Sequence, residues 1–342
     1  RTLSFAKAQG VFYGVELLFD NSVFRPREWS AHPLNRQNGG WLETDEQGTG
    51  WMAMFDLDNS THVRHVERYL RYTVARLSAY WNVFWALGAE SGNLAQVPGR
   101  ELPVERIRAW YEHWGDRVAD WDVYGRLQTI GDTGEQEALV RSRRNQFILT
   151  QEHTSMEKEG AFIEATHRFG ERFWRYGRPT VIGEQDRHNV GRYEAERKGY
   201  WTAFVSGFLM GRVDRHFGVA QHGQLVESEL FGCGNPPPIY ADLKRMRRFV
   251  ETEGVQYWRM APADALLREV KGIVHCLARE DEAYVLYFVS GGSAELELVD
   301  CQYEWFNPRT AEKLEGNCKA GRCVFAAPDE QDWVLYIRRG DN

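Results

Sequence analysis

Four apolar segments of the chain end in acidic or polar residues. Asp20 follows LLF, Glu90 follows WALGA, Glu184 follows VIG, and the run QEH at 151–153 follows FILT. Two carboxyl groups facing each other across a pocket can cleave a glycosidic bond. One, with a raised pKa, protonates the leaving oxygen, and the other, ionised, attacks the sugar carbon. A separation of about 5 Å between them leads to retention of configuration. These acids are therefore candidates for acid–base and nucleophilic chemistry.

The segments before these acids have the near-continuous apolar pattern of parallel strands buried on both faces. Amphipathic helical patterns separate them, for example over residues 63–77 and 104–118. Regular alternation of strand and helix predicts a parallel α/β architecture. No G-x-G-x-x-G follows a strand, which argues against a dinucleotide-binding fold. The predicted strands lie near residues 11, 82, 126, 147, 180 and 208.

We therefore expect an α/β fold of the (β/α)8 TIM-barrel type, with active-site residues at the carboxyl ends of the strands. A closed barrel of this type has eight βα units, whereas the pattern of this chain gives six. Either two further units lie in the chain without a recognisable pattern, or the first two are absent from it. Residues upstream of Arg1, or another polypeptide, would then complete the barrel. The chain opens at Arg1 without Met, as a processed or truncated N-terminus would.

After residue 262 the pattern changes to short strands separated by turn signals such as Ser290-Gly291-Gly292. This pattern predicts an antiparallel β-sandwich, preceded by a helix over residues 239–258. We expect two domains, a barrel domain at 1–262 and a β-sandwich at 263–342, which suits a chain of 342 residues.

Cysteines are concentrated in the predicted sandwich. Cys276, Cys301, Cys318 and Cys323 all lie there, and Cys233 is left over. Four clustered cysteines in a small β domain predict two disulfides and an oxidising compartment. A zinc site is the rival interpretation, but no C-x-x-C pair is present and only His275 lies nearby.

Composition and charge narrow the function classes. The net charge is −7 and the chain contains 13 Trp, 15 Tyr and 18 Phe. No long basic run is present, so we expect no nucleic-acid partner. No apolar stretch approaches the roughly 20 residues that span a membrane. The aromatic side chains suit either a large core or a cleft that stacks on sugar rings. Asn59-Ser60-Thr61 is a glycosylation sequon or a helix cap.

Several segments taken together resemble a known family. WNVFWALGAE at 81–90 is similar to the fourth strand of the large clan of retaining (β/α)8 glycoside hydrolases, and PTVIGE at 179–184 to the seventh. Within that clan the chain most resembles the apiosidase-like bacterial hydrolases with a C-terminal domain of collagen-binding type. Further supporting stretches lie at 38–40, 71–82, 122–128, 200–211, 284–292, 305–310 and 332–337.

The resemblance implies that Glu90 is the acid/base and Glu184 the nucleophile, acting on a carbohydrate. We expect a secreted, extracellular or periplasmic protein, and we predict no cofactor and no metal-ligating residues. Ala89 stands where the clan usually has the Asn that contacts the sugar 2-hydroxyl, and Gly131 where relatives often show His. A catalytically degenerate carbohydrate-binding or structural protein is therefore the alternative. Further candidates for lining a substrate cleft are Asp20, Trp29, Trp41, Gln151, His153 and His216.

Overall fold

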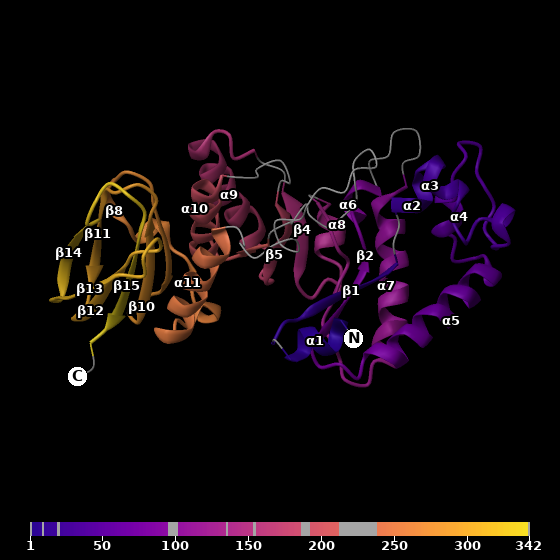
Figure 1. The fold of residues 1–342 in the computed structure, drawn as a ribbon, viewed down its shortest axis with the longest axis horizontal. Coiled ribbons are helices and arrows are strands. Elements are labelled where there is room, and N and C mark those ends of the chain that lie inside the picture. The colour runs from indigo at the N-terminus through magenta and orange to yellow at the C-terminus, as the bar shows by residue number, and fades with distance from the viewer. Residues whose placement is uncertain are drawn as a thin grey trace. The chain divides into compact units, whose positions relative to one another are not determined.

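The computed structural model describes residues 2–8, 10–18, 21–94, 102–134, 136–152, 155–185, 192–211 and 238–340 (Figure 1). The chain forms two compact units, Arg1–Gln151 and Glu152–Asn342. In the part of the chain that is described, no helix combines the length and apolar character needed to cross a membrane.

The first unit contains a parallel sheet with the strand order β1-β2-β3, formed by Tyr13–Leu18, Val83–Gly88 and Gln128–Thr129. Tyr13 pairs with Val83, and Trp85 pairs with Gln128. Helices α5 (Ser60–Leu77) and α7 (Val104–Trp121) pack against each other, and α7 packs on β2. Trp85, Trp110 and Trp114 are fully or almost fully buried, so much of the Trp content of this unit fills its core.

The long segment between β1 and α5 folds into short helical turns rather than an open loop. Its N-terminal half holds α2 (Asn21–Phe24), α3 (Pro26–Ser30) and a 3-10 turn at Arg36–Asn38. α4 (Trp51–Met54) follows, and then Asn59 caps α5 by accepting a hydrogen bond from the His62 N–H at 3.0 Å. The remaining helices of the unit are α1 (Thr2–Ala8), α6 (Ser91–Leu94) and α8 (Glu137–Val140).

The second unit begins within β4 (Ile148–Glu152), which belongs to a parallel sheet of order β4-β5-β6. β5 is Thr180–Gln185 and β6 is Leu209–Met210, with Val181 paired to Leu209. Three helices accompany these strands: α9 (Glu159–Trp174), α10 (Tyr193–Val205) and α11 (Ile239–Thr252). Nearly every residue of α10 is buried because α9, α11 and the C-terminal strands all pack on it.

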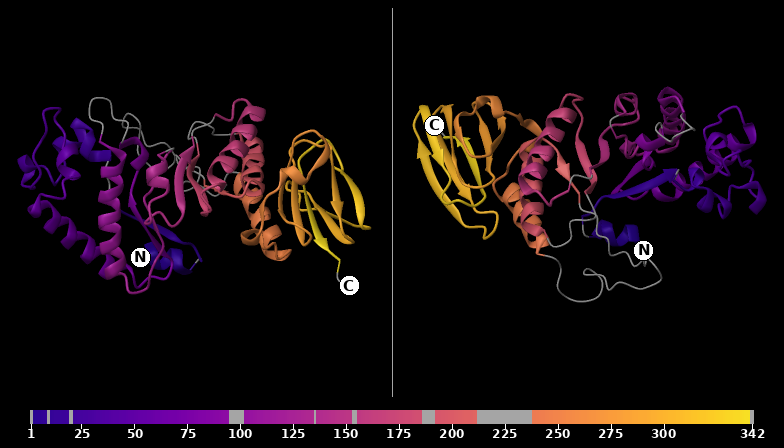
Figure 2. Two further views of the ribbon diagram at one scale, coloured as in Figure 1. Left: turned by 180° about the vertical axis from the view of Figure 1, so that it is seen from behind. Right: turned by 90° about the horizontal axis from the view of Figure 1, so that it is seen from above.

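The C-terminal strands form two layers, which Figure 2 shows face to face. The six-stranded sheet has the order β13-β12-β15-β10-β9-β7, and the three-stranded sheet the order β14-β11-β8. Between them lies a core that includes Phe288, Trp305 and Leu335. The strands of the larger sheet are β7 (Ala261–Pro262), β9 (Val274–Arg279), β10 (Ala283–Phe288), β12 (Cys301–Phe306), β13 (Lys313–Cys318) and β15 (Trp333–Arg339), and those of the smaller are β8 (Arg268–Lys271), β11 (Ser293–Leu298) and β14 (Gly321–Ala326). The expected antiparallel β-sandwich is thus present.

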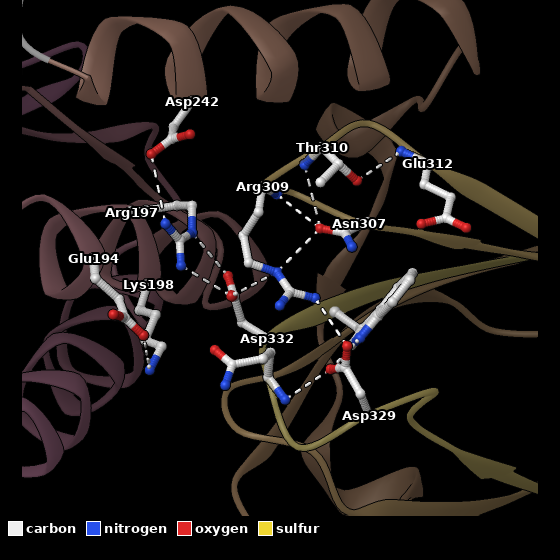
Figure 3. Close-up of polar contacts among 12 residues, drawn as sticks. Glu194, Arg197, Lys198, Asp242, Asn307, Arg309, Thr310, Glu312, Asp329 and Asp332 are labelled. Carbon is white, nitrogen blue, oxygen red and sulfur yellow. Dashed lines mark hydrogen bonds and ion pairs between the residues drawn. The ribbon is translucent and has the colours of Figure 1, made fainter.

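A buried polar network joins α10 to this sandwich (Figure 3). Arg197 donates two hydrogen bonds of 3.0 Å to the carboxylate of Asp332, which is fully buried. Tyr287 Oη donates to the same carboxylate at 3.1 Å. Burial disfavours the charge on Arg197, but Asp332 more than offsets this and raises the pKa of Arg197. Aromatic contacts such as Phe249 against Phe306, 4.9 Å between ring centroids, surround the network.

This packing bears on the domain boundary expected at residues 262 and 263. The β-sandwich does begin there, with β7 at Ala261–Pro262. However, its contacts with α10 and α11 place it in the same compact unit as β5 and β6, and the boundary between the two units lies within β4. Two separate domains at 1–262 and 263–342 stay a prediction.

The expectation of two disulfides is half right. Cys318 and Cys323 are bonded and join β13 to β14, whereas Cys276 and Cys301 are buried free thiols. Cys276 lies on β9 and Cys301 on β12, with β10 and β15 between them. Because neighbouring strands are about 4.8 Å apart, the Cα atoms of these two cysteines are too far apart for a disulfide. Burial raises the pKa of the Cys276 thiol above its usual range, so it behaves as a core residue.

Candidate active site

The carboxyl end of β2 is held by two glycines that no other residue could replace without rearrangement. A Cβ on Gly88 would lie 2.2 Å from Tyr111 Oη, and one on Gly131 would lie 2.0 Å from the carbonyl oxygen of Gly88. Gly131 also has a left-handed φ of 94°. These close approaches bring the loop after β3 against the end of β2, and so bring the residues that follow both strands together.

Hydrogen bonds fix the chain immediately after Glu90. Ser91 Oγ lies 2.8 Å from Tyr111 Oη and 3.1 Å from the carbonyl oxygen of Ile130. The Gly92 N–H donates to the carbonyl oxygen of Asp132 at 2.6 Å. Glu90, half-buried, has a φ of 48°, a left-handed conformation that costs a non-glycine residue about 1–2 kcal/mol. Strain of this kind is concentrated at functional sites, because surrounding contacts must impose it.

Two further carboxyl groups share the electrostatic environment of Glu90. Glu16 on β1 pairs with Ala86 of β2 and keeps access to solvent. Burial by the surrounding protein and then the charge of Glu90 raise the pKa of Glu16. Burial also raises the pKa of Asp132, and the charge of Glu90 adds a smaller contribution. Hydrogen bonds from Thr150 Oγ1 and two backbone N–H groups lower this pKa but do not offset the effect of burial. Glu16 within β1, Glu90 after β2 and Asp132 after β3 are thus coupled through the charge of Glu90, and we call these three acids the acidic cluster.

The raised pKa of Glu16 predicts a pH-dependent stability difference. A carboxyl group whose pKa is raised by folding binds its proton more tightly in the folded state, so its ionisation costs stability as pH rises above the usual range. We expect Glu16→Gln to be more stable than the wild type near pH 7.5, by up to about 1 kcal/mol because solvent screens Glu16. The gain should vanish near the usual Glu pKa of 4.5. Urea unfolding at both pH values, with the exposed Glu105→Gln as control, measures it. An equal gain at both pH values would contradict the assignment.

Trp29 does not line a cleft, whereas for Trp41 that role stays a prediction. Trp29 is fully buried, and its indole N–H donates to Thr44 Oγ1 at 3.0 Å, so it is a core residue rather than a platform for a sugar. Trp41 is partly buried, donates to His62 Nδ1 at 3.1 Å and stacks on His65 at 4.1 Å. The sequence pattern does not separate a core Trp from a cleft Trp, because both occur in polar loops.

Of the other predicted site residues, the structure describes the side chain of Gln151 but not those of Glu184, Asp20, His153 and His216. Gln151 is half-buried on β4, and its backbone N–H donates to Asp132 Oδ1 at 3.1 Å, which brings it beside the acidic cluster. Glu184 belongs to β5, three strands after β2 along the chain, but its side chain lies outside the described part of the structure. Asp20, His153 and His216 also lie outside the described residues.

Sequence reasoning missed Glu16 and Asp132. Glu16 interrupts the apolar run VELL of β1, and a charge within that apolar run was the available signal. Asp132 stands in the loop after β3, just beyond the Gly131 that marks the end of that strand. Both are recognised only once the register of β1, β2 and β3 is known.

A cavity of about 530 Å³ in the second unit does not coincide with the expected catalytic edge. It is lined by Arg178 and Thr180, at the start of β5, and by the partly exposed Trp174 and Trp258. In barrels of parallel strands the chemistry takes place at the carboxyl ends. We therefore do not assign this cavity to the active site.

Comparison with solved structures identifies proteins of the same fold. A glycoside hydrolase family 5 protein from Bacteroides vulgatus ATCC 8482 has a TM-score of 0.64 at 12% identity, covering 98% of this chain and 73% of its own. A second glycoside hydrolase has a TM-score of 0.60 at 12% identity, covering 100% and 88%. The chain has a (β/α)-barrel fold with a C-terminal β-sandwich. A family 27 β-L-arabinopyranosidase from Geobacillus stearothermophilus is more distant, with a TM-score of 0.53 at 9% identity, covering 100% and 77%.

These identities are low enough that the comparison establishes the fold and nothing finer. The sequence matches no protein-family model, and comparison with curated proteins finds no match.

Proposed function

We propose that the chain is a retaining glycoside hydrolase in which Glu90 is the acid/base and Glu184 the nucleophile. The observation that carries the proposal is Glu90 itself. It stands at the carboxyl end of a central parallel strand, in a strained left-handed turn that hydrogen bonds hold in place, beside two carboxyl groups of raised pKa. Perturbed carboxyl groups gathered at one strand edge are typical of acid–base sites.

The mechanism assigns a separate task to each carboxyl group. Glu184 attacks the anomeric carbon while Glu90 gives its proton to the departing oxygen, which leaves a covalent glycosyl-enzyme. Glu90, now ionised, removes a proton from water as that water displaces Glu184.

The finer identity is also a proposal. We infer an apiosidase-like hydrolase with a C-terminal domain of collagen-binding type. We also infer that the protein is secreted or periplasmic, because the Cys318–Cys323 disulfide suits an oxidising compartment. Six parallel strands are described, whereas a closed barrel of this type has eight. The intact mass and N-terminal sequence of native material would show whether residues upstream of Arg1 or another polypeptide add further units.

A catalytically degenerate carbohydrate-binding protein is the second candidate, and Ala89 favours it. Ala89 precedes Glu90, where the resembled clan has an Asn that contacts the sugar 2-hydroxyl. The loss of one well-placed donor removes about 3–4 kcal/mol of transition-state stabilisation. Such a protein would keep the pocket and bind carbohydrate without cleaving it.

A panel of aryl glycosides separates the two candidates. If the protein is a retaining hydrolase, the wild type hydrolyses at least one substrate, and NMR shows that the product keeps the anomeric configuration. Glu184→Gln is then slower by more than about 10⁴-fold. If the protein only binds carbohydrate, the wild type and Glu184→Gln are equally inactive, while a polysaccharide still binds to both in affinity electrophoresis. Inversion of configuration would reject the retaining mechanism.

A further inference from the structure

A second group of titratable side chains lies in the C-terminal unit, apart from the strand-end acids. His167 of α9, Asp264 of the 3-10 turn Asp264–Leu266 and His275 of β9 converge there. Asp264 Oδ2 lies 2.8 Å from His275 Nδ1 and 3.3 Å from His167 Nε2. Glu171, one helical turn after His167, places Oε1 at 3.6 Å from His167 Nε2.

Each of these separations is close to the distance between two ligand atoms of one small cation, and the ligand atoms of His167, Asp264 and His275 all lie within 4.8 Å of one another. Bonds of about 2.0–2.1 Å from zinc to nitrogen and oxygen, in a tetrahedron, put neighbouring ligand atoms roughly 3.3 Å apart. The three separations of 2.8, 3.3 and 3.6 Å bracket that value. Two imidazoles and a carboxylate are a ligand set that suits Zn²⁺ and related divalent metals better than Mg²⁺ or Ca²⁺.

Neighbouring groups orient the three side chains. His167 Nδ1 lies 2.9 Å from Ser206 Oγ, and the Cys276 N–H donates to Asp264 Oδ1 at 2.6 Å. Both His side chains are largely buried, with 15% and 12% exposure, whereas Glu171 is 61% exposed. Burial and the neighbouring His275 lower the pKa of His167, which keeps its ring in the neutral form that metals bind.

We propose that His167, Asp264 and His275 bind one Zn²⁺-class divalent cation, with Glu171 or water as the fourth ligand, and that the cation fastens α9 to the β-sandwich. As the cation binds, the proton on His167 moves from Nε2 to Nδ1, and the Nδ1–H donates a hydrogen bond to Ser206 Oγ. The proton on His275 moves from Nδ1 to Nε2, which frees Nδ1 for the cation. The rings now stack with 3.7 Å between centroids at 19°, so they must tilt apart for both nitrogens to point at one ion.

The competing account is a hydrogen-bonded cluster without metal, in which both rings donate to Asp264. Titration of the chelator-treated full chain with ZnCl₂ in a calorimeter, with MgCl₂ as a comparison, separates the two. We expect one Zn²⁺ per chain and no Mg²⁺ binding, with the affinity for Zn²⁺ reduced about 100-fold or more in His167→Gln and in His275→Gln. His113→Gln, on α7 with its ring against Trp114, is the control and should bind as the wild type does.

A second measurement keeps the proposal testable if either variant fails to fold. Zn²⁺ should protect His167 and His275 of the wild type from diethyl pyrocarbonate, as mapped by mass spectrometry, and CoCl₂ should give the visible bands of a tetrahedral site. Absence of stoichiometric Zn²⁺ binding, equal binding by the variants, or unchanged modification of both His residues would each overturn the proposal.

Discussion

The loss of activity in Glu90→Gln should depend on how strongly the leaving group of the substrate requires protonation. On glycosides with poor leaving groups we expect kcat/KM to fall by about 10³-fold, equivalent to about 4 kcal/mol of transition-state stabilisation. On aryl glycosides with acidic leaving groups the loss in kcat/KM should be small, because the departing phenolate needs no general acid. Initial rates for a series of aryl glycosides of graded leaving-group pKa measure the difference.

Azide provides an independent readout for the same variant. A general base is needed to activate water in the second step, whereas azide attacks the glycosyl-enzyme without one. Azide should therefore raise the turnover of Glu90→Gln and yield a glycosyl azide, but should leave Glu105→Gln unaffected. Equal losses across the whole leaving-group series, without azide rescue, would show that Glu90 has a different role.

Asp332→Ala should destabilise the folded protein strongly. It would leave Arg197, 11% exposed, and Tyr287, fully buried, without their shared partner. Arg197 would keep its longer ion pair with Asp242, at 3.7 Å, but would lose both hydrogen bonds to Asp332. Breaking a buried ion pair by removing one partner costs about 3–5 kcal/mol. We expect a decrease of that size in the free energy of unfolding, measured by urea denaturation followed by circular dichroism.

Two companion variants locate the source of that cost. Asp329→Ala removes a carboxylate that is half-exposed and bonded to Arg309 and Trp333, and should cost about 1 kcal/mol. Replacing both members of the pair, as in Arg197→Met with Asp332→Leu, should recover much of the loss, because no unpaired charge is left. A cost for Asp332→Ala no larger than that for Asp329→Ala would mean that water reaches Arg197 and compensates for its partner.

Regular periodicity made much of the architecture predictable. Alternating apolar segments and amphipathic helices indicated a parallel α/β fold followed by a β-sandwich, since burial on both faces of a parallel sheet leaves a near-continuous apolar run. The predicted strands near residues 82, 180 and 208 correspond to β2, β5 and β6. β8 and β13 were not predicted, because both are exposed and polar and show no apolar alternation.

The pairing of cysteines and the burial of tryptophans could not be predicted from the sequence pattern, because both depend on which distant residues the fold brings together. Sequence proximity suited Cys318 and Cys323, which are bonded, but strand order in the sheet separates Cys276 from Cys301. A polar neighbourhood in the sequence suggested that Trp29 lines a cleft, yet its side chain fills the core. Neither result is encoded in local spacing.

The sequence by itself determined the class of fold and singled out Glu90 and Glu184, because an acid that ends an apolar strand can be recognised locally. Only the tertiary structure joined Glu16 and Asp132 to Glu90, and His167 to Asp264 and His275. Strand register and helix packing set those distances, and electrostatic coupling and metal coordination act over a few ångströms of space whatever the separation along the chain.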